Sequence, residues 1–342
     1  MLRQSLLFLS QSPTAQRLVS GAPLARQVAE RFVAGETLDD AVAAARALNE
    51  SGLSVTLDYL GESVSSRAEA EEATDVAIRT IERIAAEGID GNFSLKPTQL
   101  GLDIDADFCR ENIARILERA REVGDGEGEI FVRIDMESSA HTERTIELTE
   151  RLWADGFRNT GTVLQSYLYR TDADLERLIA LGTRIRLVKG AYNEPPSVAY
   201  PEKAEVDRHF IEQMQVLLER GNYPAIATHD EAIIAATRRF AWETGVRKDS
   251  FEFQMLYGIR RDLQLRLSEE GYNVRTYVPF GGSWYPYLMR RLAERPANVA
   301  FIASNLARES PLGRLGHPVA LGAGVVAGAL AAMKWGNRRN SH

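Results

Sequence analysis

This sequence of 342 residues has one cysteine, no cluster of histidines and none of several common catalytic motifs. Its single cysteine, Cys109, excludes an internal disulfide bond and a cysteine-rich metal site, and fits a reducing cytoplasm. The five histidines are scattered along the chain, so we expect no bound metal. A Walker loop and a nucleophile elbow are also missing, so neither P-loop nor α/β-hydrolase chemistry gains support.

An excess of positive charge and an apolar run long enough to span a membrane are missing as well. The net charge of −7 gives no support to nucleic-acid binding. The first 13 residues contain an apolar run of only four, too short for a signal peptide, so we expect a helix there. Residues 318–333 are uncharged and rich in alanine and glycine, but are fewer than the roughly 18 residues of a spanning helix. We expect a mobile or loosely docked helical tail, and contact with a membrane surface is the alternative.

A regular alternation of strand-like and helix-like patterns fills most of the chain. The expected strands are residues 53–60, 92–96, 129–135, 162–168, 185–189, 225–229, 251–257 and 273–279. The expected helices that follow them are residues 66–87, 105–123, 142–154, 172–181, 205–220, 232–244, 260–270 and 285–294. Eight such pairs predict an α/β fold, a (β/α)8 barrel of the TIM type.

A doubly wound open sheet is the alternative fold, but it usually has a glycine-rich phosphate turn after its first strand. Residues 60–63, Leu-Gly-Glu-Ser, lack that pattern. We therefore expect N-terminal helices over residues 1–50 that pack on the barrel, a catalytic barrel over residues 51–302, and a tail over residues 303–342.

Polar side chains stand at the predicted strand ends, which is where barrels of this type place their chemistry. These residues are Lys96, Asp135, Gln165, Arg186, Lys189, Thr228, His229, Gln254 and Tyr277. Arg186 is unusual because it stands inside an apolar strand, where an unpaired charge costs several kcal/mol. Taken singly, each residue has a structural explanation as a helix cap, a loop residue or a structural histidine. Their convergence on one barrel mouth favours a ligand site.

The last predicted helix has an unusual polar face. Tyr287, Arg290, Arg291 and Glu294 follow helical spacing and share one side. This face could be solvated and hold an arginine–glutamate pair. Alternatively, the helix caps the mouth and directs both arginines at a bound anion, because adjacent guanidinium groups repel each other unless an anion lies between them.

The residues at the proposed mouth predict its ligand. Its cations are Lys96, Arg186, Lys189, Arg290 and Arg291, and its carboxylates are Asp135 and Glu294. We therefore expect a positive pocket that holds an anion. Tyr192, Tyr277 and Tyr287 add aromatic walls suited to a small apolar ring.

Seven short motifs follow one another in an order that is typical of one family. They are Ser-Leu-Lys at 94–96, Ile-Asp-Met-Glu at 134–137, Leu-Gln at 164–165, Arg-Leu-Val-Lys-Gly-Ala-Tyr at 186–192, Ala-Thr-His at 227–229, Glu-Phe-Gln-Met-Leu-Tyr-Gly at 252–258, and Tyr-Leu-Met-Arg-Arg at 287–291. On these motifs, from about residue 55 to residue 301, the chain resembles proline dehydrogenase. The resemblance covers the single-function bacterial form and the corresponding domain of the bifunctional proline utilization A proteins.

The resemblance implies a distorted barrel with its eighth helix over the mouth and a noncovalently bound FAD. It implies oxidation of L-proline to Δ1-pyrroline-5-carboxylate, with electrons passed to a membrane quinone. A separate pyrroline-5-carboxylate dehydrogenase would carry out the next step. The implied location is the cytoplasm, with peripheral contact at the inner face of the cell membrane.

The resemblance also implies a role for each candidate residue. Asp135 and Arg186 would be catalytic, with Arg186 hydrogen-bonded to flavin N5. Substrate would contact Lys96, Tyr192, Tyr277, Tyr287, Arg290, Arg291 and Glu294. FAD would contact Met136, Gln165, Arg186, Lys189, Gly190, Ala191, Thr228 and His229. One departure is Asn-Glu-Pro at 193–195, where the bifunctional proteins carry a tryptophan and an acidic residue, and it favours the single-function branch.

Two other functions are compatible with a polar barrel mouth. In a lyase or aldolase of the same fold, Lys96 or Lys189 would form a Schiff base with a carbonyl substrate. A binding module without chemistry would use the same residues only to hold a ligand.

Overall fold

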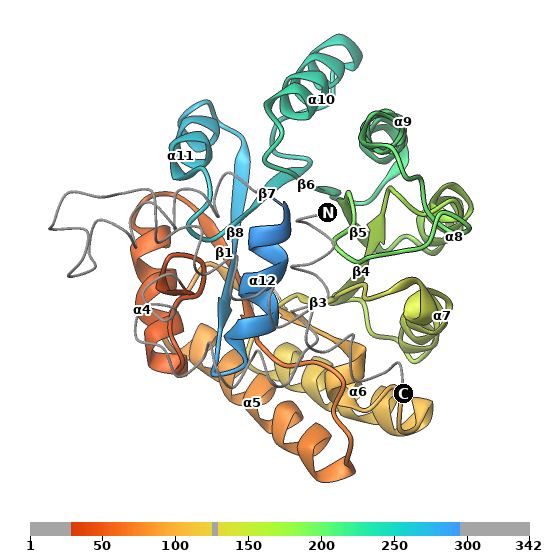
Figure 1. Cartoon of the computed structure of the whole chain (residues 1–342). Helices are drawn as coiled ribbons and strands as arrows, with labels where there is room; N and C mark the ends of the chain where they lie inside the picture. Colours follow the sequence, from red (N-terminus) through yellow and green to blue (C-terminus); the bar gives the residue numbers. More distant parts are fainter. Residues whose placement is uncertain (1–28, 125–128, 295–342) are drawn as a thin grey trace, which may run out of the picture. The chain divides into compact units, whose positions relative to one another are not determined.

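The central feature of the fold is a closed barrel of eight parallel strands. The computed structural model describes residues 29–124 and 129–294. Each strand pairs with its neighbours in sequence, and β8 pairs with β1, as Figure 1 shows. The strands are β1 (Ser54–Tyr59), β2 (Gly91–Leu95), β3 (Val132–Ile134), β4 (Thr160–Gln165), β5 (Arg184–Val188), β6 (Ala225–Ala227), β7 (Glu252–Leu256) and β8 (Asn273–Phe280). The predicted (β/α)8 barrel is confirmed, and closure excludes the open sheet.

A helix follows each of the first seven strands and lies outside the barrel (Figure 1). These helices are α5 (Arg67–Ala86), α6 (Ala106–Glu122), α7 (Ser139–Ala154), α8 (Thr171–Leu181), α9 (Lys203–Arg220), α10 (Glu231–Thr244) and α11 (Arg261–Glu269). A short 3₁₀ helix, η1 (Pro97–Leu100), follows β2. The sequence accounts for α5 well. Ser66 and Glu69 form a capping box at its start, and Ala77, Ile81 and Ile84 recur at helical spacing on its buried face.

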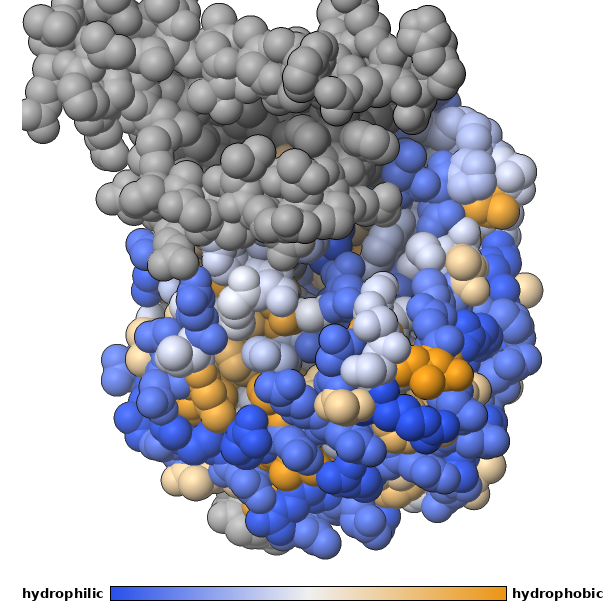
Figure 2. All heavy atoms as spheres, turned by 60° about the horizontal axis from the view of Figure 1, so that its bottom comes forward, coloured by the Kyte–Doolittle hydropathy of each residue, from blue (hydrophilic) through white to orange (hydrophobic). Residues whose placement is uncertain are grey.

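Apolar side chains from the strands and the inner helix faces form one continuous core. The face of the molecule in Figure 2 is largely hydrophilic, and its apolar residues form small separate groups. Within the described residues, no helix is long and apolar enough to span a membrane.

Helix α4 (Leu38–Asn49) precedes the first strand and packs against β1 and β8. It begins at a capping box formed by Thr37 and Asp40. Since β1 and β8 form the seam of the barrel, α4 takes the wall position that the helix after the eighth strand fills in a regular barrel. That later helix, α12 (Trp284–Glu294), forms where it was predicted.

Most predicted elements differ from the observed ones only at their ends, and β4 differs most. It was predicted at 162–168 but runs from Thr160 to Gln165. Gly161, which an apolar pattern does not mark, pairs with both β3 and β5. The predicted tail over residues 303–342, and most of the predicted N-terminal helices, lie outside the described residues.

Candidate active site

A buried carboxylate and a buried guanidinium meet at the carboxyl ends of the strands. Arg186 on β5 donates from Nη1 to Oδ1 of Asp135 at 2.7 Å. Tyr277 on β8 donates its hydroxyl to the other oxygen, Oδ2, at 2.7 Å, and Ser94 on β2 donates to Oδ1 at 2.7 Å. The structure thus brings together three residues predicted from separate strand ends. Burial, together with the Asp135 carboxylate, raises the pKa of Tyr277 well above its ordinary value.

The other two nitrogens of Arg186 have different surroundings. Nε donates to the amide oxygen of Gln254 on β7. Nη2 is buried and has no hydrogen-bond partner among the described residues. Leaving such a donor unsatisfied costs about 1–3 kcal/mol, so a ligand atom is its natural acceptor. The Arg186 Cζ atom also lies 5.2 Å from the centroid of the Tyr277 ring.

A second layer of buried charge holds Gln254 in one orientation. Its amide nitrogen donates to the carboxylate of Glu252. Arg275 also bonds Glu252, with Nε 3.0 Å from Oε2. Burial alone would raise the pKa of Glu252, but the Arg275 guanidinium holds it below its ordinary value. With its nitrogen committed to a carboxylate, Gln254 presents its oxygen to Arg186.

Lys96 forms a buried ion pair that was not predicted from the sequence. Its Nζ lies 2.7 Å from Oδ1 of Asp58 on β1, whose side chain is 1% exposed. Burial favours the neutral amine, yet the Asp58 carboxylate raises the pKa of Lys96 above its ordinary value. A permanently charged lysine is a poor Schiff-base nucleophile. It retains donor protons for a ligand carboxylate, because an ammonium group has three.

Lys189, at the end of β5, is also committed to carboxylates. Its Nζ lies 2.6 Å from Oδ1 of Asp207 on α9 and 2.9 Å from Oδ2 of Asp230 at the start of α10. It therefore cross-links a strand end to two helices. The expected excess of positive charge is not found among the described strand ends. There, Lys96, Arg186 and Lys189 are paired with Asp58, Asp135, Asp207 and Asp230.

Gly190 and Gln165, two of the predicted FAD contacts, also have protein partners. Gly190 has a φ of +119°, and a Cβ at this position would lie 2.4 Å from the ring of Tyr167. The backbone at this glycine is therefore approached closely by a protein side chain. Gln165 donates from its amide to the carbonyl oxygen of Glu137 at 2.8 Å. Met136 is buried, whereas Ala191 and Tyr192 are half-buried in the loop after β5.

Thr228 and His229 follow β6 and stabilise the neighbouring backbone. The Thr228 hydroxyl accepts from the Asp230 N–H at 3.1 Å. His229 Nε2 accepts from the Leu256 N–H at 2.9 Å. Because a backbone N–H can only donate, we assign His229 as the neutral tautomer with its proton on Nδ1.

On α12, Tyr287 and Arg291 lie on one face of the helix, as their spacing predicts. The Arg291 Cζ atom is 5.0 Å from the centroid of the Tyr287 ring. The side chain of Glu294 lies outside the described part of the chain. That Arg290 and Arg291 face the barrel mouth stays a prediction.

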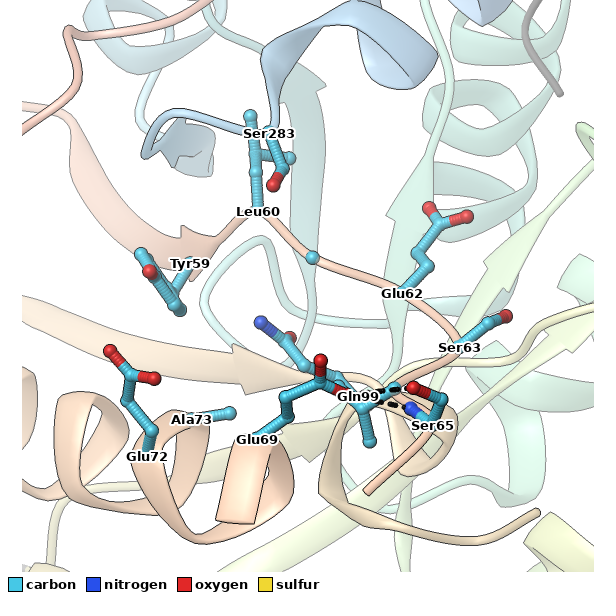
Figure 3. Close-up of a pocket in the computed structure, with 12 residues that line it drawn as sticks. Tyr59, Leu60, Glu62, Ser63, Ser65, Glu69, Glu72, Ala73, Gln99 and Ser283 are labelled. Carbon is cyan, nitrogen blue, oxygen red and sulfur yellow. Dashed lines mark hydrogen bonds between the residues drawn. The ribbon is translucent and has the colours of Figure 1, made fainter. Parts of the chain in front are cut away.

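A separate cavity of about 320 Å³ lies beside the β1–α5 loop (Figure 3). Its lining includes Glu62, Glu69, Glu72 and the side chain of Gln99, but none of the residues that surround Asp135. Three carboxylates make it unsuited to an anion. In residues 29–124 and 129–294, no group of histidine, cysteine and carboxylate side chains is arranged to hold a metal ion.

A family comparison and comparisons with individual proteins give the same family for this chain. The family described as "Proline dehydrogenase" matches residues 41–304. The chain is 42% identical over 307 residues to "Proline dehydrogenase 2" of Bacillus subtilis, covering 90% of this chain and 99% of that protein. It is 43% identical over 312 residues to "Proline dehydrogenase" of Deinococcus radiodurans, covering 89% and 97% of the two chains.

A solved structure shares the fold. Proline utilization A from Bdellovibrio bacteriovorus, inactivated by N-propargylglycine, matches with a TM-score of 0.73 and 24% identity. The match covers 94% of this chain and 39% of that protein.

Proposed function

The chain belongs to the proline dehydrogenase family, and from this premise we propose that it oxidises L-proline to Δ1-pyrroline-5-carboxylate with FAD bound noncovalently in the barrel mouth. Its activity is that of a proline dehydrogenase, an oxidoreductase. The observation that carries the cofactor proposal is the buried Nη2 atom of Arg186, a donor that has no acceptor among the described residues. The isoalloxazine ring has nitrogen and oxygen acceptors that fit it.

When bound, FAD supplies the acceptor for the hydride that leaves the proline ring. Arg186 would donate to the flavin at N5 and favour negative charge there. Met136, Gln165, Lys189, Gly190, Ala191, Thr228 and His229 would hold the rest of the cofactor. Because Gln254 and Asp135 fix two of its nitrogens, Arg186 needs no reorganisation to present the third.

The substrate would be oriented through its carboxylate. Lys96, kept charged by Asp58, would donate to that group together with Arg290 and Arg291 of α12. The ring of Tyr277, fixed through its hydroxyl to Asp135, would form one wall of the proline site. Tyr192 and Tyr287 would form the others, with Glu294 pairing to the arginines. Since α4 takes the wall position beside β1 and β8, we propose that α12 covers the mouth instead.

The substrate amine must be neutral for its lone pair to assist hydride loss. Asp135 is the carboxylate bonded to Arg186, and Ser94 and Tyr277 also donate to it. It is therefore poorly placed to stabilise a substrate ammonium, which favours the reactive amine. We propose a membrane quinone as the final electron acceptor and a separate pyrroline-5-carboxylate dehydrogenase for the next step.

The visible absorption spectrum of the purified protein tests the proposal. We expect the yellow band of oxidised flavin, which L-proline bleaches without oxygen and which D-proline leaves unchanged. A soluble quinone should then restore the band. A colourless protein, or a yellow one that L-proline does not bleach, would contradict the proposal. Trapping of a lysine by borohydride and a carbonyl substrate would favour the lyase instead.

A further inference from the structure

The loop between β5 and α9 carries Tyr192, and its role here rests on the proposed function, in which Tyr192 forms a wall of the proline site. The first part of this loop is held firmly. Lys189 is bonded to two carboxylates, and Gly190 packs against the ring of Tyr167. The Tyr167 N–H also donates to the Lys189 carbonyl at 3.0 Å. The backbone is therefore fixed up to residue 190.

The part of the loop after Pro195 is held by the β4–α8 loop, which also contains Tyr167. The Tyr169 hydroxyl donates to the Pro196 carbonyl at 2.8 Å, and the Tyr200 N–H donates to the Tyr167 carbonyl at 2.8 Å. Leu168 and Ala199 form an isolated antiparallel bridge. Both ends of the loop are thus fixed to the loop after β4.

Glu194 fixes the middle of the loop, between residue 190 and Pro195. Its Oε1 accepts from the Ser139 N–H at 2.7 Å, and its Oε2 accepts from the Ser139 hydroxyl. Ser139 is the first residue of α7. The N-cap residue of this helix, Ser138, does not cap it, and its hydroxyl lies 3.0 Å from His141 Nδ1 instead. A carboxylate from a different loop therefore supplies the cap, which the helix dipole favours.

The position of this contact restricts Tyr192. Residues 191–193 alone separate the fixed points at Gly190 and Glu194, and four residue steps span at most ~14 Å. We propose that Glu194 is a positioning residue for the reaction, because its bond to α7 holds Tyr192 in place over the substrate. The same bond links this loop to the segment that carries Asp135, four residues before Ser139.

A double-mutant cycle tests this role by steady-state kinetics of proline oxidation. Glu194→Ala should raise KM for proline about tenfold, the scale of a lost charged hydrogen bond that orders the Tyr192 loop, and change kcat less than about twofold. Glu194→Gln keeps an acceptor for the Ser139 N–H and should have a smaller effect. With Tyr192→Ala already present, either change at Glu194 should leave KM unaltered, because both residues act through one ring.

The matched control is Asp105→Ala. Asp105 caps α6 by accepting from the Phe108 N–H at 2.8 Å, outside the β5–α9 loop. It should lower Tm as Glu194→Ala does but leave KM unchanged. If Glu194→Ala is too unstable to purify, the cycle is run with Glu194→Gln. If a change at Glu194 raises KM by the same factor with and without the Tyr192 ring, Glu194 is not a positioning residue for Tyr192. The proposed function is unaffected by that result. If the wild-type protein does not oxidise proline, the proposed function itself is contradicted.

Discussion

Asp58 and Lys96 form an ion pair almost out of contact with water, and their energetics differ from those of a surface pair. Each charge has lost most of its hydration, so its partner is what makes burial tolerable. Removing one partner leaves an uncompensated charge, whereas removing both can be nearly neutral. The stability and the function of this pair can therefore be separated by mutation.

We expect Asp58→Asn to lower the free energy of unfolding by about 3 kcal/mol, because Lys96 is left charged and buried. Asp58→Asn combined with Lys96→Met should recover most of that loss. Urea unfolding measures both effects. The double variant should still bind proline poorly, since it lacks the ammonium group. Equal destabilisation by the single and double variants would contradict this account.

Tyr277 gives a prediction about alkaline pH. Burial and Asp135 raise its pKa well above the ordinary value, so the folded protein keeps a proton that the unfolded chain releases above pH ~10. The free energy of unfolding should therefore fall as pH rises through that value, by up to ~1.4 kcal/mol per pH unit. Tyr277→Phe should show a shallower fall in urea unfolding at pH ~9–11. Identical slopes in the two proteins would refute the assigned cause.

The same sequence pattern marks Arg186 and Asp58, although only Arg186 was predicted as a site residue. Both are charged residues within an apolar strand. Asp58 lies inside β1, and only the pairing of the strands in the barrel brings it to Lys96, so the sequence does not predict this ion pair. Asp207 and Asp230, the partners of Lys189, had no such signal. Acidic residues near helix starts are common, and only the tertiary structure brings these two together.

At the scale of elements, strand–helix alternation was sufficient to predict the barrel, but not the ends of its strands. β6 was predicted over five residues, and only Ala225–Ala227 pair as a strand. After Ala227 the backbone turns, so that Thr228 accepts from the Asp230 N–H in the same loop and His229 accepts from the Leu256 N–H at the end of β7. Side-chain periodicity cannot report such a turn, because the residues remain buried or half-buried beyond it.

The end of β5 depends on a glycine. Gly190→Ala would add both backbone strain and overlap with Tyr167, whereas Gly156→Ala adds strain alone, since Gly156 has a φ of +94° and open space beside it. We expect Gly190→Ala to lower the free energy of unfolding by about 1–3 kcal/mol more than Gly156→Ala does. Urea unfolding compares the two. Equal losses of unfolding free energy in the two variants would mean that the Tyr167 ring moves aside without destabilising the protein.

Helix α12 gives a prediction about binding. Arg290→Met and Arg291→Met should each raise KM for proline at least about tenfold, because a charge-assisted bond to the carboxylate is lost. Flavin absorbance should be retained in both variants. Arg239→Met on α10 is the matched control, since Arg239 is an exposed arginine of the outer wall. Loss of flavin, or an unchanged KM, would contradict the predicted role of the helix.

At the scale of the whole molecule, a single buried thiol reports on unfolding. Cys109 lies on α6, and burial raises its pKa to about 12. We expect no reaction of the native protein with a disulfide reagent such as dithionitrobenzoate, and one reactive thiol in urea. The labelling rate in dilute urea should follow global unfolding measured by circular dichroism. Rapid labelling of native protein would show that α6 detaches locally.

The seam between β1 and β8 has a consequence for biosynthesis. Ser54 pairs with Arg275 and Tyr59 with Phe280, so the wall closes only when segments about 220 residues apart in the chain meet. While the ribosome is still translating the middle of the chain, the edge of β1 that will receive β8 has no partner. Unpaired strand edges invite pairing with other chains. The nascent protein is therefore most prone to aggregate before residue 280 leaves the exit tunnel.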